Sequence, residues 1–196
     1  DRPIDEYATS DASLLRDHLI DRGLTINTIK RMYSTIRSVI NLAITEEGIG
    51  CSNAFAKTYM PEFNDSKERQ PITNEDIKTI QNECRKIDDE KRWLIALISD
   101  TGMRLSEAAG LLKDDLKVNE SIPYVDINPH LWRSLKTKSS IRKVPLVGAS
   151  LWAARSIIEN NNDSTFAFPL YTNENKCNSN SASAALNKWL RNRLGE

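Results

Sequence analysis

Residues 101–111 read Thr-Gly-Met-Arg-Leu-Ser-Glu-Ala-Ala-Gly-Leu, and this stretch decides how the second half of the chain is interpreted. It follows Trp93–Ile98, a run that is apolar on nearly all sides and predicts a buried central helix. Gly102 ends that helix and lets the chain turn, so Arg104 can project from a tight connection between two helices. Glu107 lies one helical turn further on, at the spacing of an ion pair with Arg104.

Two interpretations of Arg104 arise from its chemistry. A guanidinium is planar, donates two parallel hydrogen bonds and stays charged at every relevant pH, which suits it to binding a phosphodiester. The alternative is a structural salt bridge with Glu107, which contributes only ~0–1 kcal/mol when it is exposed. We favour phosphate binding because a second basic stretch lies further along the chain.

The second informative stretch, residues 135–146, reads LKTKSSIRKVPL. We predict strands at Ile122–Ile127, Leu131–Leu135 and Arg142–Val147, the last two joined by a polar turn. The wider segment 127–158 carries no acid and six basic residues: Arg133, Lys136, Lys138, Arg142, Lys143 and Arg155. Such a segment favours contact with phosphate, although a solvated surface is the alternative for this segment taken alone.

The first part of the chain predicts helices. One helix ends at Gly23, and a longer one begins after Thr25 or Asn27 and ends at Gly48. Between residues 22 and 45 there is no acid and there are four basic residues: Arg22, Lys30, Arg31 and Arg37. The last three lie largely off the apolar stripe of the longer helix. This arrangement fits a helix along a DNA backbone, and equally an ordinary surface helix.

A polar stretch from about Tyr59 to Gln70 suggests a boundary between domains. We predict a helical domain at residues 1–62, a linker at 63–72 and a second domain at 73–196, whose first helix is capped by Thr73. A final helix is expected from about Ser181 to Leu194. The predicted fold class is therefore mainly α with a small antiparallel β-sheet in the second domain, an α+β fold.

Residues 101–111 resemble the box of the tyrosine recombinases, the phage integrase family, that holds their first catalytic arginine. Residues 135–146 resemble the family's β-hairpin with its catalytic lysine, and Asn27–Arg31 is similar to the start of the long helix in its core-binding domain. The order and spacing fit, and the resemblance covers essentially the whole chain. It implies a helical, SAM-like core-binding domain followed by an integrase-type catalytic domain.

The resemblance also implies roles for individual residues. Arg104 would grip the scissile phosphate, with Glu107 orienting it, and Lys136 would be the general acid that protonates the departing 5′ oxygen. Lys138 stays an alternative to Lys136, because the register of a hairpin is uncertain from sequence. The expected DNA-binding residues come from both halves of the chain: Thr28, Lys30, Arg31, Arg37, Arg133, Arg142 and Lys143.

The family further needs a His-x-x-Arg box and a tyrosine nucleophile, both C-terminal to these segments. His130 has Arg133 three residues on, but it precedes the hairpin lysines and falls beside an expected strand, so we reject it as that box. The tyrosines of the chain come too early to be the nucleophile: Tyr7, Tyr33, Tyr59, Tyr124 and Tyr171. No nucleophile is assigned, and we expect the sequence to be a C-terminally truncated recombinase.

Composition narrows the chemistry further. The chain has 27 Lys and Arg against 27 Asp and Glu, so it is not a polycation that coats nucleic acid. Three scattered cysteines and two histidines give neither a disulfide framework nor a metal-ligand spacing, and no cofactor is implied. No apolar run reaches the roughly 18 residues of a membrane span, so we expect a cytoplasmic protein, associated with the bacterial nucleoid.

These expectations combine into one hypothesis. The full protein would break and rejoin double-stranded DNA at specific sites through a 3′-phosphotyrosyl link, as a homotetramer on paired sites and a monomer without DNA. The 196 residues of this chain would by themselves lack that activity. Two alternatives remain: a DNA-binding protein without chemistry that occupies recombination sites, and, ranked last, a helical protein-interaction module.

Overall fold

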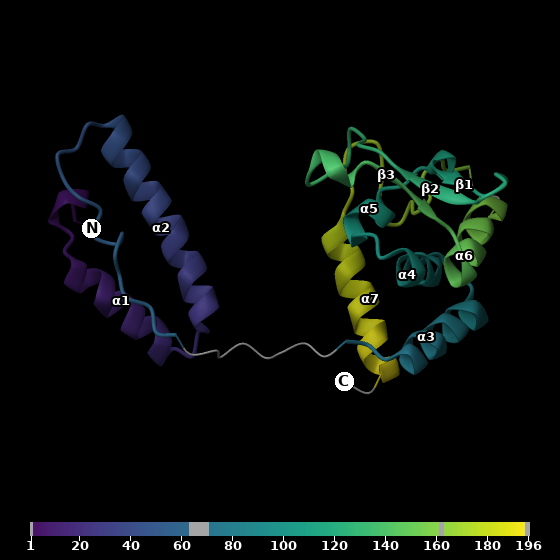
Figure 1. The fold of residues 1–196 in the computed structure, drawn as a ribbon, viewed down its shortest axis with the longest axis horizontal. Helices are drawn as coiled ribbons and strands as arrows, with labels where there is room; N and C mark the ends of the chain where they lie inside the picture. The colour runs from purple at the N-terminus through teal and green to yellow at the C-terminus, as the bar shows by residue number, and fades with distance from the viewer. Residues whose placement is uncertain (1, 63–70, 161–162, 195–196) are drawn as a thin grey trace. The chain divides into compact units, whose positions relative to one another are not determined.

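The computed structural model describes residues 2–62, 71–160 and 163–194, and it divides into two compact units (Figure 1). Unit 1 is Asp1–Gln70 and unit 2 is Pro71–Glu196. The linker predicted at 63–72 lies largely outside the described residues. None of the helices in the described ranges has the length and hydropathy needed to cross a bilayer.

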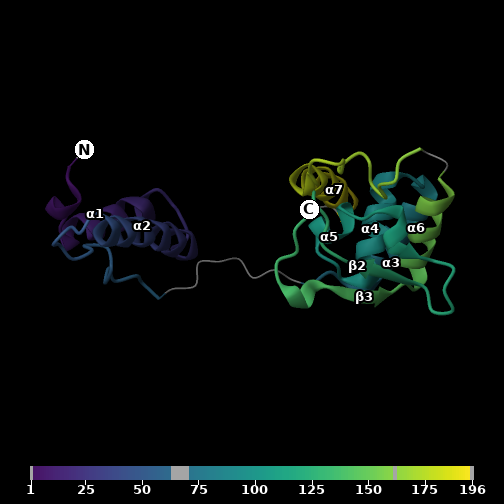
Figure 2. The same cartoon turned by 90° about the horizontal axis from the view of Figure 1, so that it is seen from above.

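Unit 1 is a pair of helices with a returning loop. A short 3-10 helix, Ile4–Glu6, precedes α1 (Thr9–Asp21) and α2 (Ile26–Glu46), which lie side by side in Figures 1 and 2. Of the two expected caps, Thr25 is the one that caps α2, since its hydroxyl accepts from the backbone N–H of Thr28 at 3.3 Å. The buried core of this unit consists of Ala12, Leu19, Ile26, Ile29, Tyr33 and Phe55.

Unit 2 contains the remaining helices and a small sheet. Its elements in chain order are α3 (Asn74–Ile87), α4 (Glu90–Thr101), α5 (Leu105–Ala109), a 3-10 helix (Lys113–Asp115), β1 (Leu116–Lys117), β2 (Tyr124–Ile127), a 3-10 helix (Lys138–Ser140), β3 (Arg142–Pro145), α6 (Gly148–Glu159) and α7 (Ser179–Leu194). The chain is therefore mainly helical with a small antiparallel sheet, which confirms the predicted fold class.

Helix α4 is the centre of unit 2, as its apolar sequence predicts. Figure 1 shows it between the sheet and α3, and Leu94, Ala96 and Leu97 are fully buried. Its last turn also fixes the start of α6, because Asp100 Oδ2 accepts from the backbone N–H groups of Ala149 at 2.7 Å and Ser150 at 3.0 Å. A carboxylate at a helix N-terminus satisfies free N–H groups and interacts favourably with the helix dipole.

The sheet differs from the prediction at one strand. Its order is β1-β2-β3, with all neighbours antiparallel, and β2 pairs directly with β3, Ile127 opposite Arg142. The predicted strand at Leu131–Leu135 is wrong, since these residues belong to the long connection between β2 and β3. Instead of pairing in the sheet, Trp132 and Arg133 donate to the carbonyls of Gly110 and Glu107, and Leu131 is fully exposed.

Candidate active site

A buried carboxylate, Glu107, holds the candidate site together. Its side chain is only 3% exposed, and its Oε1 accepts from Arg104 Nη1 at 2.7 Å. Its Oε2 accepts from Arg142 Nη2 at 2.9 Å and from the backbone N–H of Arg104 at 3.1 Å. One carboxylate thus binds the arginine that precedes α5 and the arginine that begins β3. The ion pair between Arg104 and Glu107, considered from the sequence as the alternative to phosphate binding, is present, with Arg142 as an additional partner.

The charge of Glu107 is stabilised by these contacts. Burial by itself favours the neutral acid, but hydrogen bonds from Arg142 and Arg104 outweigh it and hold the pKa of Glu107 below its ordinary value of 4.5. Glu107 therefore stays ionised at neutral pH. An ionised, buried acceptor can keep both guanidinium groups in a fixed geometry.

The two arginines face a polar hollow of about 380 Å³. Its lining residues are Gly102, Arg104, Thr137, Ser139, Ser140 and Arg142. The side chains of Arg104 and Arg142 are 53% and 33% exposed, so both keep donors free for an anion entering from solvent. Arg104 Nη1 also donates to Ser140 Oγ at 3.3 Å, and Arg142 Nη1 donates to the Ser140 carbonyl at 2.9 Å. None of the lining residues is acidic, which makes the hollow suited to phosphate.

Local backbone geometry explains why Arg104 points this way. Gly102 ends α4 with φ +62°, a left-handed conformation that glycine adopts without strain. Arg104 then lies in extended conformation directly before α5, and the Glu107 carboxylate caps the start of that helix through the Arg104 N–H. The turn predicted from Gly102 therefore brings the guanidinium out of the core.

The two candidate general acids lie on the connection that lines this hollow. Lys136 and Lys138 are both exposed, and Lys138 begins the 3-10 helix before β3. Neither lysine lines the hollow itself, whereas their neighbours Thr137 and Ser139 do. The hairpin that carries the lysines is formed by β2 and β3, not by a strand at 131–135. Sequence reasoning missed the hydroxyl residues of the hollow, which lie within the LKTKSSIRKVPL stretch.

Arg133 does not lie at the surface where the sequence analysis expected a DNA contact. It is 4% exposed, and its guanidinium donates to the backbone carbonyls of Glu107 and Asn128. Lys143, in contrast, is exposed, with its ammonium 3.2 Å from the Tyr124 hydroxyl and 4.5 Å from the centre of that ring. Lys143 is thus available at the surface, whereas Arg133 is part of the packed interior.

The expected DNA-binding residues of unit 1 also fall into two groups, those exposed to solvent and one that packs against the rest of the unit. Thr28, Lys30 and Arg31 are exposed on α2, and two of them line a shallow hollow on that helix. Arg37 instead turns toward the loop, where its Nε donates to the Phe55 carbonyl at 2.8 Å. The guanidinium of Arg37 also lies 5.9 Å from the centre of the Tyr33 ring. Arg37 therefore contributes to the packing of unit 1.

His130 contacts Asp115 and Trp132, and Tyr171 is buried in the interior of unit 2. The His130 ring nitrogen lies 2.9 Å from Asp115 Oδ2, and the ring stacks on Trp132 with centroids 4.7 Å apart. Tyr171 is 6% exposed, and burial raises its pKa, which disfavours a nucleophilic phenolate. No tyrosine is among the residues that line the polar hollow. The rejection of His130 and of these tyrosines as catalytic groups fits these surroundings.

In the described part of the chain, no cluster of three or more His, Cys, Asp or Glu side chains could hold a metal ion. Burial raises the pKa of Cys84 to about 12, so this thiol is protonated at neutral pH.

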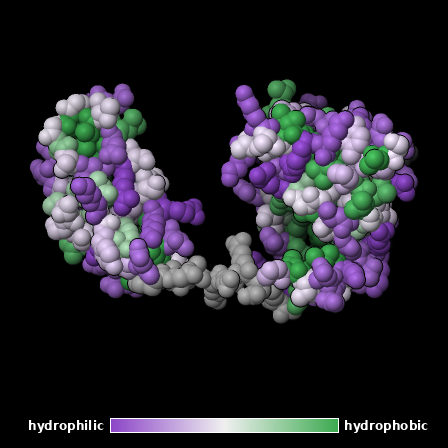
Figure 3. Space-filling view, viewed as in Figure 1, coloured by the Kyte–Doolittle hydropathy of each residue, from purple (hydrophilic) through white to green (hydrophobic). Residues whose placement is uncertain are grey.

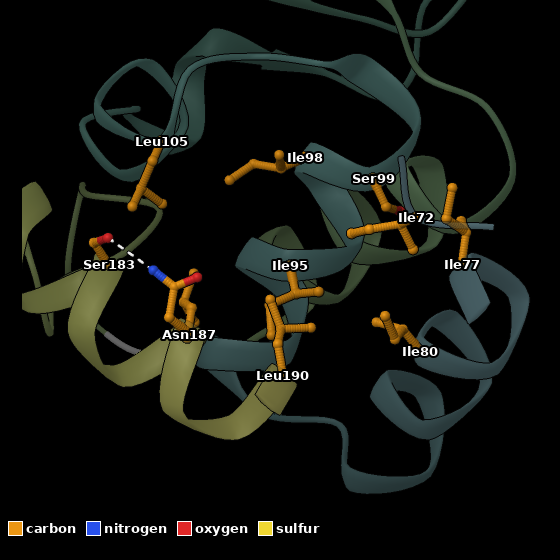
Figure 4. A pocket seen from close by; sticks show the side chains of 11 residues that line it. Ile72, Ile77, Ile80, Ile95, Ile98, Ser99, Leu105, Ser183, Asn187 and Leu190 are labelled. Atoms are coloured by element: carbon orange, nitrogen blue, oxygen red, sulfur yellow. Dashed lines mark hydrogen bonds between the residues drawn. The ribbon is translucent and has the colours of Figure 1, made fainter. Parts of the chain in front are cut away.

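A second hollow in unit 2 is apolar. Figure 3 shows hydrophobic side chains within a largely hydrophilic surface, and Figure 4 shows this hollow from close by, between α3, α4 and α7. Its volume is about 320 Å³, and it is lined by Ile72, Ile77, Ile80, Ile95, Ile98, Ser99, Leu105, Ser183, Leu186, Asn187 and Leu190. None of these lining residues is titratable, so the apolar hollow offers no acid–base group.

Comparison with known proteins gives both a family and similar folds. Residues 70–195 match the phage integrase family, and no curated protein matches the chain. The integrase of the Tn1549 transposon, solved in complex with circular intermediate DNA, is 18% identical with a TM-score of 0.71, over 99% of this chain and 66% of that one. An arginine-to-lysine variant of it with another circular intermediate DNA is 20% identical with a TM-score of 0.73, over 98% and 66%.

A tyrosine-to-phenylalanine variant of the same integrase, with transposon right end DNA, is 22% identical with a TM-score of 0.65. That match covers 88% of this chain and 58% of the solved one. The present chain thus spans at most about two thirds of the length of these solved chains. At such identities the likeness concerns the fold.

Proposed function

The chain belongs to the phage integrase family, and from that premise we propose that the protein breaks and rejoins double-stranded DNA at specific sites, with Arg104 binding the phosphate of the strand that is cut. In this proposal residues 1–62 form a core DNA-binding domain, and residues 73–196 form part of a catalytic domain, joined by a linker at 63–72. The observation that carries the proposal is the Glu107 cluster, in which Arg104 and Arg142 face an acid-free hollow.

The chemistry we propose is transesterification. A tyrosine attacks the scissile phosphate, a 3′-phosphotyrosyl link forms and the 5′ oxygen leaves, so the energy of the phosphodiester is kept for rejoining. Negative charge grows on the phosphoryl oxygens as the nucleophile attacks. Guanidinium donors that are already held in place stabilise this charge without reorganisation, and Glu107 provides that preorganisation for Arg104 and Arg142.

Proton transfer to the leaving 5′ oxygen is assigned to Lys136, with Lys138 as the alternative. Both are exposed on the connection whose hydroxyl residues line the hollow, so a flexible ammonium from either position can approach a phosphate bound there. A lysine that acts as general acid must be protonated when the oxygen departs.

The nucleophile is proposed to come from residues other than these 196. The tyrosines of unit 2 are Tyr124, which contacts Lys143, and Tyr171, which is buried with a raised pKa. The His-x-x-Arg box is likewise assigned elsewhere, because His130 is paired with Asp115. The 196-residue chain alone would then bind DNA without cutting it.

DNA is proposed to be held by both units. Exposed Thr28, Lys30 and Arg31 on α2 would contact the duplex, together with Lys143 of unit 2. Solved integrases with similar folds are complexes with DNA, which supports this partner. The active assembly is proposed to be a homotetramer on two paired sites, and the free protein a monomer.

The test is strand cleavage by the full-length protein with Arg104→Ala. We expect formation of the covalent protein–DNA complex to fall by about 10²–10³-fold or more, as on removal of an oxyanion-stabilising donor, while DNA binding is largely kept. Arg155→Ala is the control, because Arg155 is exposed on α6. Unchanged cleavage by Arg104→Ala would contradict the proposal. A parent protein that binds recombination sites but never links to them covalently would support the alternative of a non-catalytic binder.

A second experiment identifies the general acid. Lys136→Ala and Lys138→Ala are each tested on normal DNA and on DNA whose 5′-bridging oxygen at the cut site is sulfur. A thiolate leaves without a proton, so the variant that lacks the general acid is slow on normal DNA and recovers on the sulfur substrate. Recovery by Lys138→Ala alone would assign the role to Lys138. Recovery by neither variant would exclude both.

A further inference from the structure

Arg133 is a buried cation at the junction of two segments that the proposed reaction needs. It is 4% exposed, and its Nη1 donates to the carbonyl of Glu107 in α5. Its Nη2 donates to the carbonyl of Asn128, where the β2–β3 connection begins. Its Nε has no hydrogen-bond partner in the described structure. A guanidinium in such a place is costly to bury, so the contacts it makes call for an explanation.

The fork shape of the side chain matters for these contacts. A guanidinium presents donors in one rigid plane, so it can bridge two carbonyl groups from different segments at a fixed separation. One of those carbonyls belongs to Glu107, whose carboxylate holds Arg104 and Arg142. Arg133 therefore ties the β2–β3 connection to the residue on which both exposed arginines depend.

Gly110 makes room for Arg133. A Cβ at position 110 would lie 2.6 Å from Arg133 Cδ and 3.2 Å from its Cβ and Cγ, closer than side chains pack. The backbone at Gly110 has φ −91°, which other residues adopt freely. Glycine is thus needed at this position for space and not for conformation. The absence of a side chain at Gly110 leaves the space that the Arg133 side chain occupies.

Neighbouring contacts hold the same part of the connection. Trp132 Nε1 donates to the Gly110 carbonyl at 3.0 Å, and its ring meets Phe166 edge-on with centroids 5.0 Å apart. The Trp132 carbonyl accepts from the backbone N–H of Cys177 at 3.1 Å. His130 is held by Asp115. Three residues of the segment from His130 to Arg133 are therefore held by other parts of unit 2, and Lys136 and Lys138 follow three and five residues after Arg133.

We propose that Arg133 is a positioning residue, which fixes the β2–β3 connection to α5 and so sets where Lys136 and Lys138 lie relative to Arg104. The catalytic consequence rests on the proposed function, whereas the mechanical link is a property of the chain by itself. Arg133 touches no DNA in this assignment. It acts through Glu107 and through the loop.

The test measures hydrogen exchange in the 196-residue chain without DNA. In the variant Arg133→Met, which keeps the length of the side chain but removes its donors, we expect the amides of Ser140 and Ile141 to exchange about tenfold faster or more. These amides bond to Thr137 and Lys138 carbonyls at 3.0 and 3.2 Å. The amide of Gly102, bonded to Ile98 at 2.9 Å, is the internal reference and should stay unchanged. Arg155→Met is the matched control.

Two outcomes would overturn the proposal. If Ser140 and Ile141 exchange at the parental rate in Arg133→Met, Arg133 does not hold the connection. If Gly102 accelerates as much as they do, Arg133 contributes only to the overall stability of unit 2.

Gly110→Ala provides a second route in case Arg133→Met fails to fold. Its added methyl should displace the Arg133 side chain and accelerate the same two amides. In an Arg133→Ala background the Cδ at 2.6 Å and the Cγ are absent and only the Cβ at 3.2 Å remains, so Gly110→Ala should accelerate the two amides less than it does in the parent. Full additivity of the two substitutions would contradict the link between them.

A cleavage readout separates positioning from simple damage. In the full-length protein, Arg133→Met should be slow on normal DNA and recover on the DNA with 5′-bridging sulfur, as the variant lacking the general acid does. A defect that sulfur does not relieve would contradict positioning of the lysine. If Arg104→Ala cleaves normally, the proposed function fails, yet the exchange result still stands or falls by itself.

Discussion

The basic residues of α2 and those around Glu107 are arranged in opposite ways. On α2, Lys30 and Arg31 are exposed, and neither forms an ion pair within the described residues. In unit 2, Arg104 and Arg142 share one buried carboxylate and line one hollow. The sequence carries an acid-free basic segment in both places, so composition alone makes the two regions look alike.

The two regions differ in whether their basic residues depend on one another. Separate exposed cations contribute independently to the attraction of a phosphate backbone, and each can be lost at a small, additive cost. Cations bound to one buried acid depend on each other, because removing the acid leaves both without their partner. The first arrangement suits positioning along a duplex. The second suits one phosphate at one place.

The largest effect that tests this comparison is expected for Glu107→Ala. Removing the acceptor leaves two partly exposed guanidinium groups without their shared partner, so we expect the free energy of unfolding of unit 2 to fall by about 2–3 kcal/mol. Urea unfolding followed by tryptophan fluorescence measures this, since Trp93, Trp132, Trp152 and Trp189 all lie in unit 2. Glu159→Ala, exposed on α6, is the control. If the free energy of unfolding falls by less than ~1 kcal/mol, Arg104 and Arg142 do not depend on Glu107 for the stability of unit 2.

The second effect is the dependence of unit 2 on pH. The pKa of Glu107 is lowered in the folded state, so its contribution to stability is present above the unfolded value of about 4.5 and is lost as pH falls through the lower folded value. The difference in unfolding free energy between the parent and Glu107→Gln should therefore be larger at pH 7 than at pH 3. A difference that stays constant over this range would argue against a lowered pKa.

A smaller effect distinguishes Arg37 from the other basic residues of α2. Because Arg37 bonds to the Phe55 carbonyl, Arg37→Ala should destabilise unit 1 by about 1.5 kcal/mol. Amide exchange in α1 and α2 measures this loss, and the fluorescence transition of unit 2 should not move. An unchanged exchange pattern together with weaker DNA binding would restore Arg37 to the DNA-binding set.

The smallest effects are expected for Lys30→Ala and Arg31→Ala. Each should reduce the slope of log K against log salt for DNA binding by about 0.9, and the double variant by about 1.8, with no change in stability. Titration of a labelled duplex at several salt concentrations gives the slopes. If the slope change in the double variant differs strongly from the sum of the two single changes, Lys30 and Arg31 depend on each other, as Arg104 and Arg142 do through Glu107.

Much of the helical framework was predictable, because it depends on local signals. The apolar run before Gly102 predicted α4, Thr73 predicted the start of α3, and the end of α7 at Leu194 matched. The i,i+3 spacing of Arg104 and Glu107 offered an ion pair as the alternative to phosphate binding, and the two side chains are paired. Caps, periodicity and i,i+3 pairs are properties of neighbouring residues, so a sequence contains them directly.

The errors concern contacts between distant segments. The stretch from Leu131 to Leu135 was expected to be a strand, but the partners of His130, Trp132 and Arg133 are Asp115, the carbonyls of Glu107 and Gly110, and Phe166. Nothing near them in sequence indicates these partners. For the same reason an arginine in an acid-free segment was expected at the surface, whereas Arg133 is buried. The approach of Arg142 to Glu107 needs the β2–β3 pairing, which fixes its position.

The short helix α5 lies between two glycines that are required for unlike reasons. At Gly102 the space where a Cβ would stand is open, but φ is +62°, so the restriction there is one of handedness, and D-alanine would adopt this backbone conformation without strain. At Gly110 the backbone has φ −91°, which L residues adopt, but Arg133 already fills the space where their Cβ would stand. Chemical synthesis with D-alanine could therefore replace Gly102 and keep the turn into Arg104, whereas an L residue in place of Gly110 would require the Arg133 side chain to move.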